Sequence, residues 1–162
     1  MARMTHKETN FRPKIALYEP DIPQNTASII RTCSCFGAIL VIIEPCGFLI
    51  SDKRFKRIVM DYIDFDQIKI YQNERHFFSS KLNERIILMT TKSDKVYTSF
   101  KFKTNDTILF GRESAGVPKK IHEKIPNKLK IPMIKKRRSL NLSTSVSVTL
   151  SELIRQTNYI HG

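Results

Sequence analysis

Short apolar runs alternate with segments of helical periodicity along most of the chain. Ile39–Ile43 is the clearest run, with five consecutive apolar residues. A run of that length without a polar position is typical of a strand buried on both faces of a parallel sheet. We predict six strands, over Ile15–Tyr18, Ile39–Ile43, Ile68–Tyr71, Ile86–Thr90, Thr107–Phe110 and Leu129–Ile131.

Between the strands, apolar residues recur at three- and four-residue spacing, which predicts amphipathic helices. In the first of them, Ala27, Ile30 and Cys33 share one face, and Gly37 is a natural terminator. We predict helices over Asn25–Phe36, Lys53–Met60, Glu74–Ser80, Pro118–Lys124 and Leu142–Asn158. The alternation of strands with helices predicts an α/β fold, a mostly parallel sheet flanked by helices.

At three places a strand runs through a polar loop into a helix start. Asn141 and Ser143 have side chains that cap helix N-termini, where free N–H groups and a partial positive charge favour ligand binding. The carboxyl ends of parallel strands meet at one edge of a sheet, so we predict a single site built from these loops. The three corners are Ile15–Tyr18 with Asn25–Arg31, Ile108–Gly116, and Ile131–Met133 with Arg138–Ser143.

The second corner holds a loop bracketed by Gly111 and Gly116. Glycine permits positive φ and close approach of the backbone to a ligand. The loop matches neither a Walker A sequence nor the dinucleotide fingerprint, which disfavours ATP and NAD. A structural turn and a binding loop both remain open. Glu113 is either an acceptor for backbone amides or a ligand amine, or a solvated acid near a helix start.

Net charge adds a prediction about partners. The formal charge is +13 over 162 residues, which favours a polyanion such as RNA, although a lysine-biased proteome would have the same effect. Four cations, Lys135–Arg138, lie beside the third corner and suit phosphate contacts, unless the run is simply a solvated loop. A second basic patch comprises Lys53, Arg54, Lys56 and Arg57, and we expect its neighbours Phe55 and Tyr62 to pack in the core.

Arg31 lies among apolar neighbours, where a charge is costly unless it is paired. It is therefore either salt-bridged or directed into a site. The spacing of Cys33, Cys35 and Cys46 fits neither a zinc nor a disulfide framework, which favours buried thiols in a reducing compartment. The four histidines lack metal-ligand spacing and lie outside the three corners, so no metal is expected.

Residues 1–14 are polar and basic, and we expect a tail there, followed by one domain over residues 15–162. The sequence has no apolar run of about 18 residues, so no transmembrane span is expected. It also has no apolar signal core at its start, and we expect a cytoplasmic location.

The three corners together resemble the three motifs of the SPOUT superfamily of RNA methyltransferases. Within it, the chain is similar to the small, single-domain tRNA 2′-O-methyltransferases that act on the wobble nucleotide. Leu17–Pro20, Ile43–Phe48, Asp52–Arg54 and Thr90–Lys92 also resemble this subgroup. The motifs read Asn25–Cys33, Phe110–Pro118, and Ile131–Met133 with Arg138–Ser143 and Ser145–Val148.

The resemblance implies a deep C-terminal trefoil knot, a rare exception to the usual absence of knots. It also implies S-adenosyl-L-methionine as cofactor and S-adenosyl-L-homocysteine as product, the tRNA anticodon stem-loop as partner, and a homodimer formed through helices 25–36 and 142–158. By the same resemblance the cofactor loops are Met89–Thr91, Phe110–Gly116 and Ile131–Asn141. The implied cofactor-binding residues are Met89, Gly111, Glu113, Gly116, Ile131, Met133, Ser139 and Leu140. The implied catalytic residues are Arg31, Asn25, Asn141 and Ser139.

Ala27 and Ser28 depart from the family pattern, which usually has Gly and then Asn there, and Arg112 replaces a smaller or cyclic residue. Two alternatives stay open, and the departures at Ala27 and Ser28 bear on the second of them. One is 2′-O-methylation of another RNA, such as rRNA. The other is a catalytically silent RNA-binding protein with the knotted fold.

Overall fold

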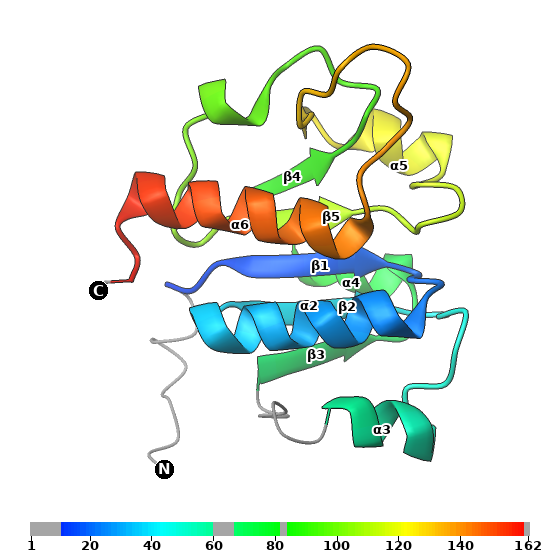
Figure 1. Ribbon diagram of the computed structural model, residues 1–162. Coiled ribbons are helices and arrows are strands. Elements are labelled where there is room, and N and C mark those ends of the chain that lie inside the picture. Colours follow the sequence, from blue (N-terminus) through cyan, green and yellow to red (C-terminus); the bar gives the residue numbers. More distant parts are fainter. Residues whose placement is uncertain (1–10, 60–66, 82–83, 161–162) are drawn as a thin grey trace.

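The computed structural model describes residues 11–59, 67–81 and 84–160 (Figure 1). Six strands form one sheet in the order β3-β2-β1-β5-β4-β6, and each neighbouring pair is parallel. The mostly parallel sheet predicted from the alternation of elements is thereby confirmed. The strands are β1 (Lys14–Tyr18), β2 (Ile39–Ile43), β3 (Ile68–Tyr71), β4 (Ile86–Met89), β5 (Thr107–Phe110) and β6 (Asn127–Leu129).

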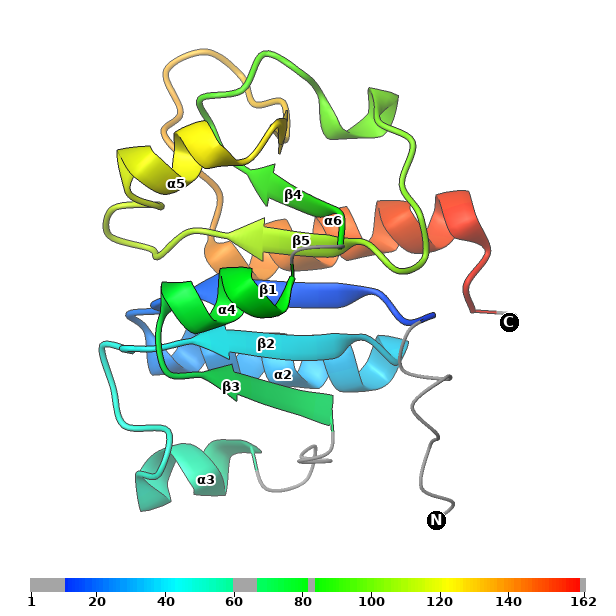
Figure 2. The ribbon, with the colours of Figure 1, turned by 180° about the vertical axis from the view of Figure 1, so that it is seen from behind.

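Helices cover both faces of the sheet. The two longest, α2 (Pro23–Phe36) and α6 (Leu142–Thr157), lie side by side on one face (Figure 1). On the other face are α4 (Glu74–Ser80) and α5 (Lys119–Lys124), as Figure 2 shows from behind. The helix α3 (Lys53–Val59) and the short 3-10 helix η2 (Tyr97–Ser99) lie in the connections. Among the residues that the structure describes, no helix is both long and apolar enough to cross a membrane.

The central strands divide the core into two layers, because successive side chains of a strand point to opposite faces. Ile15 and Leu17 of β1 pack in the layer beneath α2 and α6. Ala16 and Tyr18 pack in the opposite layer with Phe77 of α4. This two-sided burial explains the continuous apolar runs in the sequence.

The ends of the two long helices follow from local sequence. Helix α2 begins at Pro23, two residues before the predicted start at Asn25, because proline fits the first turn of a helix, where no N–H is needed. It ends at Gly37, whose φ of 67° is in the left-handed region. Asn141 caps α6 as predicted, accepting a hydrogen bond from the Thr144 N–H at 3.2 Å.

The sixth strand was predicted wrongly. It spans Asn127–Leu129 and shares only Leu129 with the predicted Leu129–Ile131, because the pairing of Leu129 with Met89 sets the register. Ile131 lies beyond the strand. The structure also describes residues 11–14 of the expected tail, in which Arg12 is buried and donates from Nε to the Gly37 carbonyl at 2.6 Å.

The predictions for Phe55, Tyr62 and the cysteines have different outcomes. Phe55 is buried in the core as predicted, whereas Tyr62 and the predicted helix end at Met60 lie outside the described residues. Of the cysteines, only Cys33 is buried, and burial raises the pKa of its thiol to about 12. Cys35 is exposed, which corrects the expectation of buried thiols.

We predict that Leu150→Ala destabilises the fold strongly, because Leu150 of α6 is fully buried in the layer beneath the helix pair. Removing its side chain should lower the free energy of unfolding by about 2–5 kcal/mol, measured by urea denaturation. Leu49→Ala is the control, since Leu49 is 71% exposed. Equal effects of the two substitutions would contradict this account of the core.

Candidate functional site

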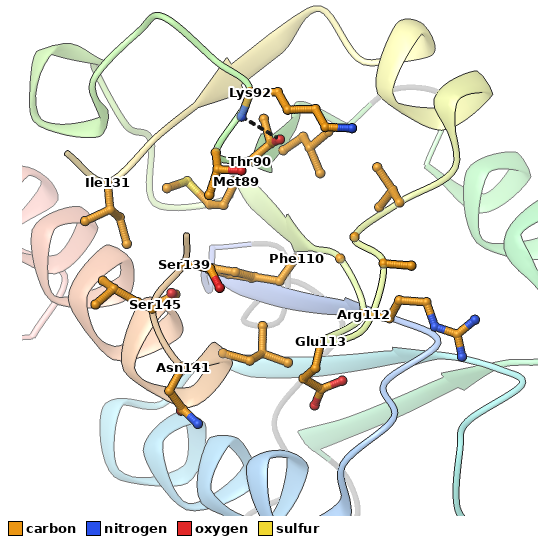
Figure 3. A pocket seen from close by; sticks show the side chains of 18 of the residues that line it. Met89, Thr90, Lys92, Phe110, Arg112, Glu113, Ile131, Ser139, Asn141 and Ser145 are labelled. Atoms are coloured by element: carbon orange, nitrogen blue, oxygen red, sulfur yellow. Dashed lines mark hydrogen bonds between the residues drawn. The ribbon is translucent and has the colours of Figure 1, made fainter. Parts of the chain in front are cut away.

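A cavity of about 490 Å³ lies at the carboxyl edge of the sheet (Figure 3). It is lined by the loops that follow β4, β5 and β6 and by the start of α2. Strands β1 and β5 are neighbours, although β1 is connected through α2 to β2 on its other side. Parallel sheets bind ligands at such a reversal of strand order. The volume lies within the range of small-molecule sites.

The cavity brings together nearly all of the residues singled out from the sequence. Arg31 is the exception: it lies on α2, exposed, and is not among the residues that line the cavity. The predicted residues that do line it are Asn25, Met89, Gly111, Glu113, Gly116, Ile131, Met133, Ser139, Leu140 and Asn141.

The Glu113 carboxylate joins the second corner to the first. It accepts hydrogen bonds from the backbone N–H groups of Asp21, at 2.7 Å, and Ile22, at 3.3 Å. Ile22 is the N-cap of α2 and has no side chain that could make this bond. An acid from a distant loop therefore binds the two amides that precede the first turn and complements the positive end of the helix. The sequence left open whether Glu113 accepts from backbone amides or a ligand amine, or is a solvated acid. The structure shows that it accepts from backbone amides.

Arg112 and Asp21 join the same two loops, but here the donor comes from the β5 loop and the acid from the β1–α2 loop. The Arg112 guanidinium donates to the Asp21 carboxylate at 2.6 Å and lies 3.4 Å from Glu19. The second oxygen of Asp21 accepts from the Ser114 N–H and hydroxyl. Hydrogen bonds from Ser114 and Arg112 lower the pKa of the Asp21 carboxyl. The arginine that departs from the family pattern thus holds the cavity loop against the β1–α2 loop.

Close backbone packing explains the glycine at the start of the cavity loop. A Cβ on Gly111 would lie 2.5 Å from the Gly116 Cα, a clash with backbone that cannot move aside cheaply. Gly116 has a φ of 66°, which an L-residue rarely adopts. Between them, Arg112 and Gly116 exchange backbone hydrogen bonds of 3.2 and 2.8 Å. The pattern of two glycines is therefore a requirement of this tight loop.

A chain of amide hydrogen bonds crosses all three corners. Asn25 donates to Glu113 at 3.3 Å and accepts from the Asn141 Nδ2 at 2.9 Å. The side-chain oxygen and nitrogen of Asn141 cannot be exchanged, because the Oδ1 atom accepts the hydrogen bond that caps α6. Beside this chain, the Ser28 hydroxyl accepts a hydrogen bond from the Ser143 hydroxyl at 2.8 Å. Ser28, which departs from the family pattern, thus joins α2 to α6. The three sequence corners thus form one connected network.

The sequence analysis missed His122, which comes from α5 and lines the cavity. Its Nε2 lies 3.4 Å from the Thr90 hydroxyl, which also accepts from the Lys92 N–H. Burial and the nearby charges of Lys128 and Lys92 lower the pKa of His122, and Glu123 opposes this shift. In the sequence His122 lies just outside the second corner. The signal for it is its position in the helix that begins after Pro118, directly after the Gly111–Gly116 loop.

Lys92 and Ser145 also line the cavity without having been singled out as site residues. Lys92 lies in the loop after β4 and Ser145 lies one turn into α6. Both belong to segments that resemble the family, Thr90–Lys92 and Ser145–Val148, but neither was predicted to be a site residue. Within the described ranges, no group of three or more His, Cys, Asp or Glu side chains is placed to hold a metal ion.

We expect Glu113→Ala to destabilise the start of α2, because the Asp21 and Ile22 amides lose their acceptor. The free energy of unfolding should fall by about 0.5–1.5 kcal/mol for each hydrogen bond that is lost. Glu123→Ala is the matched control, because Glu123 is exposed and pairs only loosely with Lys119, at 3.7 Å. A larger loss in the control would contradict this role of Glu113.

His122 should make stability depend on pH. Its pKa in the folded chain lies below the ordinary 6.5, so between the two values the unfolded chain binds more protons. The free energy of unfolding of the parent chain should therefore fall as the pH drops through 6.5, and His122→Asn should lack this component. Urea denaturation of both proteins from pH 8 to pH 5 measures the difference. Parallel curves of unfolding free energy against pH for the two proteins would show that His122 has the same pKa in the folded and the unfolded chain.

Three comparisons place these features among known proteins. The model of the SpoU rRNA Methylase family matches residues 12–151. The chain is 40% identical over 147 residues to a tRNA (cytidine(34)-2'-O)-methyltransferase of Escherichia coli (strain K12), covering 90% of this chain and 94% of that relative.

The fold agrees with the sequence comparison. A solved structure described as giving insight into the 2-OH methylation of C/U34 on tRNA has a TM-score of 0.84 and 32% identity, covering 91% of this chain and 97% of that one. The SpoU methyltransferase AviRb from Streptomyces viridochromogenes, in complex with AdoMet, is only 21% identical and shows the fold alone, with a TM-score of 0.78, covering 91% of this chain and 61% of that one. Since the family model spans most of the chain and the relatives agree with it over nearly their full length, this protein belongs to the SpoU methylase family.

Proposed function

We propose that this protein transfers a methyl group from S-adenosyl-L-methionine to the ribose 2′-hydroxyl of the tRNA wobble nucleotide, a cytidine or modified uridine. The observation that carries the proposal is the single cavity formed by all three sequence motifs. The relatives named for this activity support it, because they match the chain over nearly its whole length. The proposed enzyme acts in the cytoplasm, as one domain over residues 15–162, and uses no metal.

The cavity fits the proposed cofactor in size and in chemistry. Met89, Phe110 and Ile131 give it apolar walls suited to an adenine ring, and Ser139 and Asn141 supply polar groups beside them (Figure 3). The close packing of Gly111 against Gly116 keeps the cavity loop tight, and both glycines line the cavity. S-adenosyl-L-methionine would supply an electrophilic methyl group and leave as S-adenosyl-L-homocysteine. Met133, Leu140, Glu113 and Gly116 complete the proposed binding set.

The hydrogen-bonded chain through Asn25 and Asn141 would orient the ribose. Both amides are fixed by partners, since Asn25 is held by Glu113 and Asn141 caps α6. Fixed partners reduce the cost of bringing a weak nucleophile into line, and proximity alone can account for much of such an acceleration. Ser139 lies on the same wall and would contact the substrate or the cofactor.

Arg31 would act on the 2′-hydroxyl or on a neighbouring phosphate. A guanidinium with a free pKa above about 12 is a poor base, so positioning and proton removal are both retained as roles. Because Arg31 lies outside the cavity lining, we propose that a second protomer completes the site. The homodimer would form through the helix pair α2 and α6, and the chain between β5 and α6 would form the trefoil knot of the family.

A second candidate is 2′-O-methylation of ribosomal RNA, which the description of the family favours. The chemistry and the cavity would be the same, and only the RNA would differ. A catalytically silent RNA-binding protein is the third alternative, and the same assay distinguishes all three.

We predict that the protein labels the wobble ribose of unmodified tRNA when given labelled S-adenosyl-L-methionine. Arg31→Ala should lower the rate by about 10²-fold or more, the usual loss for a group acting on the transferred proton. Arg75→Ala is the control, an exposed arginine on α4, across the sheet from α2. Nucleoside mapping identifies the product.

Each alternative gives a different result in this assay. Label at another ribose, or only in ribosomal RNA, would move the substrate and keep the chemistry. Cofactor binding without label in any RNA would overturn the proposed activity. Equal rates for Arg31→Ala and Arg75→Ala would remove Arg31 from the catalytic set.

A further inference from the structure

The segment Ile134–Arg138 forms an exposed rim of the cavity. Its neighbours on both sides, Met133 and Ser139, line the cavity, whereas all five residues of the segment are exposed. Figure 1 shows this stretch within the connection between β6 and α6, on the side of the molecule where the loop after β4 also lies. Ile134 is 75% exposed, so the segment adds little to the core. What it presents to solvent is charge.

The four consecutive cations Lys135–Arg138 lack compensation within the described part of the chain. None of them forms an ion pair with a described carboxylate. Lys92, from the loop after β4, also lines the cavity and adds a further positive charge. Like charges at this density repel one another and destabilise the compact chain, and a polyanion bound beside them would relieve that repulsion.

The backbone of the segment is held in a definite turn. Lys136 has a φ of 75°, a left-handed conformation that residues other than glycine rarely adopt. The turn is closed by a hydrogen bond from the Arg137 N–H to the Ile134 carbonyl at 3.4 Å. A fixed turn presents its cations in a set direction, and arginine binds phosphate through two parallel N–H groups.

We propose that the rim segment 134–138 binds the phosphodiester backbone of the RNA substrate beside the nucleotide to be modified. The proposal rests on the proposed function and deepens it, because it assigns the RNA contact to named residues. RNA is favoured over another anion because the segment borders the cavity itself, and a ribose in an RNA chain carries a phosphate on each side. The cations would hold those phosphates while the ribose faces the cavity.

The test compares two variants of equal charge. Lys135→Ser with Lys136→Asn removes two cations from the rim, and asparagine tolerates the left-handed backbone at 136. Lys101→Ser with Lys103→Asn removes two exposed cations from the segment before β5, at the opposite edge of the sheet. Fluorescence anisotropy with a labelled anticodon stem-loop RNA, at saturating S-adenosyl-L-homocysteine, measures binding without turnover from 0.05 to 0.5 M salt.

The rim variant should bind this RNA about 25-fold more weakly at 0.1 M salt than the parent chain, the factor that two lost phosphate contacts give over a tenfold change in salt from 1 M. Each lost contact to a single-stranded phosphate should reduce the slope of log affinity against log salt by about 0.7, or about 1.4 for two. The control should retain the parent slope and affinity, and unchanged S-adenosyl-L-homocysteine binding would show that both variants are folded.

Equal affinities and slopes for the two variants would overturn the proposal. So would a rim variant that keeps its RNA affinity and loses binding to vesicles of phosphatidylserine, because the surface would then serve a membrane. A parent chain that binds the stem-loop through the rim and transfers no methyl group to any RNA would support the rim contact and overturn the proposed function. The two ideas therefore fail in distinguishable ways.

Discussion

The parallel pairing of β1 with β2 on one side and β5 on the other is the constraint on which the site depends. It brings the carboxyl ends of strands far apart in sequence to one edge, and the chain must leave each strand there through a loop. Burial enforces the arrangement, because Ile15 and Leu17 face one apolar layer and Ala16 and Tyr18 the other. A strand buried on both faces has few ways to shift register without exposing apolar surface or burying polar groups.

Reciprocal pairing between the loops then fixes the shape of that edge. Glu113 from the β5 loop accepts from the amides that precede α2, and Asp21 from the β1 loop holds Arg112 and Ser114 in return. Each carboxylate satisfies donors that the other segment cannot satisfy from its own side chains. A cavity wall made in this way is positioned before a ligand arrives, which lowers the entropy cost of binding.

The distribution of charge complements this geometry. The acids Glu19, Asp21 and Glu113 are engaged by neighbouring loops, whereas the cations of the rim segment 134–138 face solvent. The acids of the loops around the cavity are therefore paired, and exposed cations border its opening. Such an arrangement suits a reaction in which a small ligand is enclosed and a polyanion lies across the opening, since the surface charges attract the polyanion over the distance set by ionic screening.

The sequence by itself determined five of the six strands, the helices and the parallel sheet, because apolar periodicity, glycine and capping side chains act over a few neighbouring positions. Ten of the residues that line the cavity followed from the resemblance of its three motifs to the family. It placed the sixth strand two residues late, since the register at Leu129 depends on pairing with Met89. Only the tertiary structure decided the partners of Glu113 and Arg112, the entry of His122 into the cavity wall and the position of Arg31 outside it. Contacts between residues about 90 positions apart, such as Asp21 with Arg112, are set by how the sheet orders its strands, and no local pattern encodes that order.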